Sequence, residues 1–141
     1  MALIIRPIRP SDRDVWLRMR ADLWPGDDHA SEIETFFAGR AVEPQAVLLA
    51  LQQGKAAGVC ELAVRTNVPG AEGLRTAFVE GLYVDPAYRN GLVARSLLKA
   101  AQGWARSKGC EAFGSDRDER FILDPKFNDE GNSLRPVPAR S

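Results

Sequence analysis

The chain has 141 residues, which fits one domain and leaves no room for a second of ordinary size. Apolar residues make up 45% of the chain and charged residues 27%, a composition that excludes disorder throughout. Its 19 basic and 19 acidic side chains cancel, so no overall field attracts a phosphate backbone and we expect no nucleic-acid partner.

The first 40 residues predict one strand followed by two helices. Leu3 to Arg6 has a short strand pattern, and Ser11 is placed to cap a helix that ends before Pro25. Residues 31–34, Ser-Glu-Ile-Glu, have the pattern of a capping box, which predicts a second short helix that ends near Gly39.

The middle of the chain changes to strand patterns. Residues 46–51 and 57–64 predict an antiparallel hairpin, and residues 76–84 predict a third strand after a loop rich in turn residues. A turn then leads to an amphipathic helix that ends at Lys108, and residues 110–115 predict a fifth strand.

The chain changes character after Asp116. Residues 117–141 hold 10 charged residues and three prolines, with one apolar cluster at residues 121–123, and they predict no clear element. We therefore expect residues 1–116 to form the core and residues 117–141 to form an atypical tail of the same domain.

Several site classes are not expected. No apolar run approaches the ~20 residues that cross a bilayer, and residues 1–7 become charged too soon for a secretory leader, so we expect a cytoplasmic protein without a membrane partner. Cys60 and Cys110 stand in apolar, strand-like stretches, which favours buried free thiols. His29 has no partner motif, and we expect no metal.

Four separated blocks carry a resemblance to a known family: Leu23 to Gly26, Phe78 to Val84, Gln102 to Trp104 with Lys108 to Cys110, and Gly114 to Asp116. With the order of predicted elements, they resemble the GCN5-related N-acetyltransferase (GNAT) superfamily, most closely the bacterial aminoglycoside 6′-N-acetyltransferases. The resemblance implies an α+β fold whose mixed, mostly antiparallel sheet is flanked by helices. It also implies transfer of acetyl from acetyl-CoA to the 6′-amino group of an aminoglycoside, by direct attack of the amine on the thioester.

The turn before the long helix suits the CoA pyrophosphate. Backbone N–H groups at a helix N-terminus bind phosphate oxygens, and Arg89 adds a cation, although an ordinary strand-to-helix turn has the same pattern. The family normally has glycine where this chain has Leu92, and Gly91 stands one residue early. The resemblance implies that the cofactor-binding residues are Leu82, Tyr83, Val84, Arg89, Asn90, Gly91, Leu92, Val93 and Ala94.

The expected reaction centre surrounds Gly81. This glycine predicts a bulge or splay point in the strand, where the N–H of Leu82 faces the thioester carbonyl. A glycine that only relieves crowding between neighbouring strands of a twisted sheet would give the same pattern. Glu80 is the expected base for the amine proton, and alternation would place it between apolar Phe78 and Leu82 on one face. Glu80 also fits a cross-strand ion pair with Arg65, or a ligand for the substrate ammonium.

A polycationic sugar needs carboxylates and aromatic faces around it. Trp24, Asp27, Glu80 and Asp116 are the expected substrate-binding residues. Asp27 and its neighbour Asp28 equally fit a solvated turn.

The resemblance implies a further helix and two strands after residue 116, with a tyrosine that protonates the CoA thiolate. No such segment is recognisable in the sequence, and Tyr83 and Tyr88 lie elsewhere, so no general acid is assigned. Because an incomplete sheet exposes edges, we expect a homodimer. Acetylation of another amine, or CoA binding without catalysis, are the alternative functions.

Overall fold

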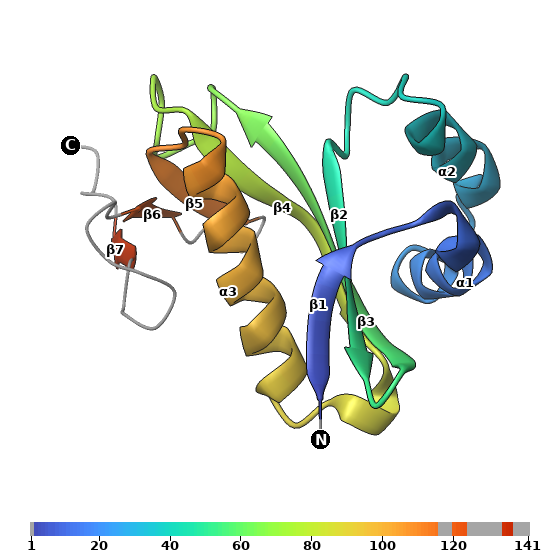
Figure 1. The fold of residues 1–141 in the computed structure, drawn as a ribbon. Coiled ribbons are helices and arrows are strands. Elements are labelled where there is room, and N and C mark those ends of the chain that lie inside the picture. Colours follow the sequence, from blue (N-terminus) through green and yellow to red (C-terminus); the bar gives the residue numbers. More distant parts are fainter. Residues whose placement is uncertain (1, 116–119, 124–133, 137–141) are drawn as a thin grey trace.

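The strands form one mixed sheet in the computed structural model, which describes residues 2–115, 120–123 and 134–136 (Figure 1). In these residues seven strands lie side by side in chain order: β1 (Leu3–Pro7), β2 (Ala46–Gln52), β3 (Lys55–Arg65), β4 (Thr76–Val84), β5 (Ala112–Ser115), β6 (Arg120–Leu123) and β7 (Leu134–Pro136). Only β4 and β5 pair in parallel, because the helix α3 (Leu92–Ser107) crosses over between them. The predicted mixed, mostly antiparallel sheet is confirmed.

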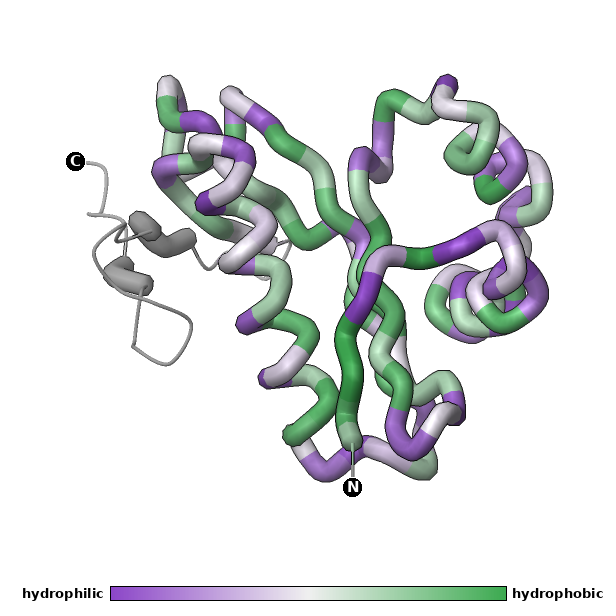
Figure 2. Tube along the Cα trace, in the orientation of Figure 1, coloured by the Kyte–Doolittle hydropathy of each residue, from purple (hydrophilic) through white to green (hydrophobic). Residues whose placement is uncertain are grey.

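Helices cover both faces of this sheet. The helix α3 packs on one face, whereas α1 (Arg13–Leu23) and α2 (His29–Phe37) pack on the other (Figure 1). Apolar positions line the strands between these layers (Figure 2). Leu97 and Ala101 anchor the α3 side of the core, and Trp16, Met19 and Ile33 anchor the opposite side. No helix among the described residues is long and apolar enough to span a membrane.

Both N-terminal helices begin at a different residue than predicted. Ser11 lies inside a short 3₁₀ turn, Pro10–Asp12, and α1 starts after Asp12, whose carboxylate accepts the N–H of Arg9 at 2.7 Å. The helix α2 starts at His29 because the carboxylate of Asp28 accepts the N–H of Ser31 at 3.2 Å. The Ser31 prediction was wrong because Asp28 offers the same spacing three residues earlier.

The hairpin prediction is confirmed, and the prediction for the tail is not. Gln53 and Gly54 form the two-residue turn, both with positive φ, as a tight hairpin requires. Beyond Asp116, where no strand was recognised, β6 pairs with β5 and β7 pairs with β6, both antiparallel. These strands are only four and three residues long, too short for a clear pattern in the sequence.

Candidate active site

A bulge interrupts β4 at Glu80. Glu61 on β3 lies opposite Gly81, whereas the next residue, Leu62, lies opposite Val79, so Glu80 is the extra residue. The predicted irregularity therefore exists, one residue before Gly81. The bulge also changes the facing of side chains: Leu82 packs in the core under α3, and it does not share a face with Glu80 as alternation had suggested.

The strand β4 extends beyond its described pairing with β5. This pairing ends at Val79 and Ser115, although β4 continues to Val84. On the other side, the N–H of Asp85 donates to Ala57 of β3 at 2.8 Å. Because strand N–H groups alternate in direction, those of Leu82 and Val84 point away from β3, toward the edge of β4 that pairs with β5 at residues 76–79. The N–H of Leu82 is thus directed away from β3, and its contact with a thioester carbonyl stays a prediction.

Glu80 forms an ion pair with Arg65, one of the alternatives considered from the sequence. The guanidinium donates Nε to Oε2 at 2.8 Å and Nη2 to Oε1 at 2.7 Å, and it lies 4.5 Å from the centre of the Phe78 ring. Arg65 Nη2 also contacts Glu43 at 3.2 Å. Burial raises the pKa of Glu80 above its ordinary value, and Arg65 opposes that shift.

An acidic cavity of about 280 Å³ opens beside Glu80. Its lining carries five carboxylates, one arginine and an indole ring: Arg20, Trp24, Asp27, Glu32, Glu43, Pro44, Glu61 and Glu80. The structure thus brings together three of the four predicted substrate residues, Trp24, Asp27 and Glu80. The fourth, Asp116, lies outside the described residues, and Asp28 serves as the cap of α2. Excess carboxylate charge beside an aromatic face suits a polycation.

A buried charge network forms one wall of this cavity, and it was missed from the sequence. Glu61 accepts hydrogen bonds from Arg20 Nε at 2.8 Å, Arg20 Nη2 at 3.2 Å and Trp16 Nε1 at 2.9 Å. Burial raises the pKa of Glu61, while Arg20 and Trp16 oppose the rise. A signal existed, because Glu61 interrupts a buried apolar strand and Arg20 follows Trp16 by one helical turn.

Trp24 bridges this network and the bulge. The centre of its ring lies 5.2 Å from the Arg20 guanidinium, and the same ring covers the backbone of Gly81. The carbonyl of Trp24 contacts His29 Nε2 at 2.6 Å, which fixes the loop between α1 and α2. His29 therefore has a structural contact, and no group of three or more metal-ligating side chains gathers in the described part of the chain.

The turn into α3 places a left-handed glycine at its cap. Gly91 has φ +90°, and the side chain of Asn90 accepts the N–H of Leu92 at 3.1 Å. The first intrahelical bond runs from Arg95 N–H to Gly91, so the N–H groups of Val93 and Ala94 belong to the free helix start. Leu92 is 45% exposed, and its side chain lies away from the core.

Arg89 and Tyr83 are held by other contacts near this turn. Arg89 Nε donates to the carbonyl of Val84 at 2.7 Å, and its guanidinium lies over the Tyr83 ring. The hydroxyl of Tyr83 donates to Asp22 at 2.8 Å on the α1 side of the sheet. Burial and the neighbouring carboxylate raise the pKa of Tyr83. Its side chain therefore lies on the face of the sheet that α1 covers.

Both cysteines are buried free thiols, as predicted. Burial raises the pKa of Cys60 to about 12, with a smaller contribution from Glu61, and burial also raises the pKa of Cys110. Neither thiol has the low pKa that a nucleophile needs.

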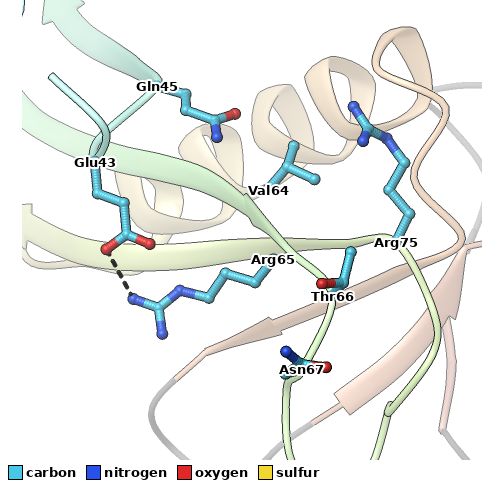
Figure 3. Close-up of a pocket in the computed structure, with 7 residues that line it drawn as sticks. All are labelled: Glu43, Gln45, Val64, Arg65, Thr66, Asn67 and Arg75. Atoms are coloured by element: carbon cyan, nitrogen blue, oxygen red, sulfur yellow. Dashed lines mark hydrogen bonds and ion pairs between the residues drawn. The ribbon is translucent and has the colours of Figure 1, made fainter. Parts of the chain in front are cut away.

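A second cavity, of about 460 Å³, adjoins the acidic one across Glu43 (Figure 3). It is lined by Glu43, Gln45, Val64, Arg65, Thr66, Asn67 and Arg75. Figure 3 shows Arg65 reaching toward Glu43 along one side of this space. Arg75 is tied to the end of α3, since its Nε donates to the carbonyl of Lys108 at 2.7 Å.

Known proteins resemble this chain in sequence and fold. Residues 13–119 match the model of the Acetyltransferase (GNAT) family. An aminoglycoside N(6′)-acetyltransferase type 1 from Klebsiella aerogenes is 41% identical over 117 residues, covering 80% of this chain and 77% of the relative. The structure of aminoglycoside N-acetyltransferase AAC(6′)-Iy with CoA matches with a TM-score of 0.73 and 30% identity, covering 83% of this chain and 78% of the other. AAC(6′)-Iy with the bisubstrate analogue CoA-S-monomethyl-acetylneamine matches with a TM-score of 0.72 and 26% identity, covering 100% and 99%.

Proposed function

The chain belongs to the GNAT family of acetyltransferases, and we propose that it transfers acetyl from acetyl-CoA to the 6′-amino group of aminoglycoside antibiotics. The observation that carries the substrate class is the acidic cavity, where five carboxylates face a single lining arginine and the ring of Trp24. Such a site neutralises several ammonium groups and stacks on a sugar ring. Acetylation removes a cation from the drug, which would confer resistance.

The edge of β4 at Leu82 suits the thioester. The N–H of Leu82 donates to the thioester carbonyl and stabilises the oxyanion that forms when the amine attacks, a contribution of typically ~3 kcal/mol. The nitrogen–carbon bond forms first, and the tetrahedral intermediate then collapses with loss of the carbon–sulfur bond. The amine gives up one proton and the departing thiolate takes up one from solvent, so CoA leaves as its thiol. Glu80, beside this edge, binds the ammonium or takes its proton.

The start of α3 suits the CoA pyrophosphate. The N–H groups of Val93 and Ala94 are free donors at the positive end of a 16-residue helix, and Arg89 adds a cation nearby. Gly91 supplies the left-handed turn that exposes them, which compensates for the side chain of Leu92. Leu82, Tyr83 and Val84 contribute backbone groups along the pantetheine arm.

Incubation with acetyl-CoA and kanamycin, followed by thiol release, tests the proposal. We expect kanamycin-dependent release, and mass spectrometry of the product should place the acetyl group on the 6′-nitrogen. Tight CoA binding without thiol release for any amine would instead indicate a non-catalytic module. Release with polyamines but not with kanamycin would indicate a different amine as substrate.

We also propose that the protein acts as a homodimer in the cytoplasm, where acetyl-CoA is available. In the described part of the chain β1 pairs only with β2, and Ile4 on β1 is 51% exposed. An open edge with an exposed apolar residue favours association. Size-exclusion chromatography with light scattering measures the mass, and a monomer at micromolar concentration contradicts the dimer.

A further inference from the structure

Two arginines neutralise carboxylates at the acidic cavity, and they differ in accessibility. The side chains of Arg20 and Glu61 are 7% and 2% exposed, and the indole of Trp16 holds the same carboxylate. The side chains of Arg65 and Glu80 are 38% and 16% exposed. A buried pair with an additional hydrogen bond is costly to break, whereas a pair with a solvent-accessible guanidinium exchanges its partners more easily. Glu80 is therefore the carboxylate whose counter-ion is free to move.

Arg65 already occupies the two carboxylate oxygens of Glu80 to which an incoming ammonium would bind. Each oxygen of Glu80 accepts one guanidinium N–H, at 2.8 and 2.7 Å. A substrate cation must therefore share Glu80 with Arg65 or replace it. Replacement leaves Arg65 without its strongest partner unless another acceptor is close.

That acceptor is Glu43. Arg65 Nη2 already contacts Glu43 at 3.2 Å, and Glu43 lies between the two cavities. The larger cavity is lined by both Arg65 and Glu43 and not by Glu80, so the guanidinium has space beside it on the way to Glu43 (Figure 3). The Phe78 ring packs against the guanidinium of Arg65, and this contact does not require a fixed position of the guanidinium along the ring.

We propose that Arg65 is an exchangeable counter-ion that selects cationic substrates. It holds Glu80 while the site is empty, and it passes to Glu43 when a substrate ammonium takes its place. The ion pair of Glu80 with Arg65 is replaced by an ion pair of Glu80 with the substrate ammonium, and the contact of Arg65 with Glu43 shortens. No charged group is therefore left without a partner. A neutral ligand brings no cation to replace Arg65, and the exchange then leaves Glu80 unpaired at a cost.

This proposal rests on the proposed function, since kanamycin serves as the polycationic probe. The experiment is a double-mutant cycle between Arg65→Gln and Glu43→Gln, with the Kd of kanamycin measured by calorimetry. We expect Arg65→Gln to tighten binding severalfold, because the competitor is gone. We expect Glu43→Gln to weaken binding about tenfold when Arg65 is present, and to change it less than twofold in the Arg65→Gln protein.

Glu32→Gln is the matched control, since Glu32 lines the same cavity and contacts Arg20 instead of Arg65. It should weaken binding equally with and without Arg65. Under the proposal, Glu43→Gln also raises KM for kanamycin while kcat and KM for acetyl-CoA stay unchanged, a split that general damage to the fold does not produce.

An equal effect of Glu43→Gln in both backgrounds would mean that Glu43 binds the substrate directly, and would overturn the exchange. Tighter binding in the Arg65→Gln protein must also appear, or the competition is refuted. Thiol release by the unaltered protein is measured separately. Kanamycin binding without release refutes the proposed function, while the cycle still decides the role of Arg65. No kanamycin binding refutes both.

Discussion

The indole ring of Trp24 lies directly on the backbone of Gly81, at the point where β4 leaves its bulge. A Cβ built at residue 81 would meet Cζ2 of Trp24 at 2.8 Å and Cδ2 of Leu23 at 3.2 Å. The absence of a side chain at Gly81 is thus what allows an aromatic wall to stand beside Glu80. This contact joins the loop after α1 to the central strand of the sheet.

Gly81→Ala should therefore act through Trp24. The new methyl group displaces the ring, and overpacking of this kind typically costs about 1–3 kcal/mol of stability. We expect KM for kanamycin to rise about tenfold, with little change in KM for acetyl-CoA. In a Trp24→Ala protein the space is already free, so adding Gly81→Ala should raise KM no further. An independent effect there would show that Gly81 acts through the backbone alone.

Glu80→Gln should reduce kcat by about 10²-fold or more if Glu80 takes the amine proton. Burial raises the pKa of Glu80 above the ordinary value of 4.5, so the carboxylate gains its proton at a higher pH than an exposed one. Activity of the unaltered protein should accordingly fall as the pH drops through that raised pKa, and a pH profile of kcat/KM measures the midpoint. The midpoint should vanish in Glu80→Gln. A profile unchanged by the substitution would assign it to another group.

Gly91→Ala should weaken acetyl-CoA binding, because alanine disfavours the φ of +90° by roughly 1–2 kcal/mol. Gly109→Ala is the matched control at the other end of α3, since Gly109 also has a positive φ and open space around it. Both variants should lose similar stability in urea unfolding. Only Gly91→Ala should raise KM for acetyl-CoA; an equal rise in both would indicate a general loss of structure.

Glu61→Leu should destabilise the fold by about 3–5 kcal/mol, because it leaves the buried guanidinium of Arg20 without its carboxylate. The double variant Arg20→Met/Glu61→Leu removes both charges and should recover most of that loss. The indole N–H of Trp16, which also loses its acceptor, should leave a deficit of roughly 1 kcal/mol or more. Urea unfolding measures all three proteins, and losses that simply add would show that the two side chains are not coupled.

Local patterns in the sequence sufficed for most of the helices and strands. The hairpin at Gly54 and the amphipathic helix before Lys108 depend on neighbours a few residues apart, so their patterns are complete in a short segment. Trp24 and Glu80 were identified through separated motifs and Asp27 through its place in the loop after Trp24, and the three line one cavity. The start of α2 was misplaced because two capping patterns overlap in the sequence, and only the folded chain chooses between them.

Only the tertiary structure decided the partners of the charged side chains. Arg20 and Glu61 stand 41 positions apart, so no local pattern pairs them, and the pairing of Arg65 with Glu80, 15 positions away, was only one of the roles that the sequence left open for Glu80. The bulge at Glu80 is likewise a property of two strands in register, and it moved Leu82 to the opposite face from the one that alternation predicted. The alternation of apolar residues along one strand indicates which side chains should share a face. The pairing of that strand with its neighbours, including any bulge, decides the direction in which each side chain points, and these directions decide the chemistry of the site.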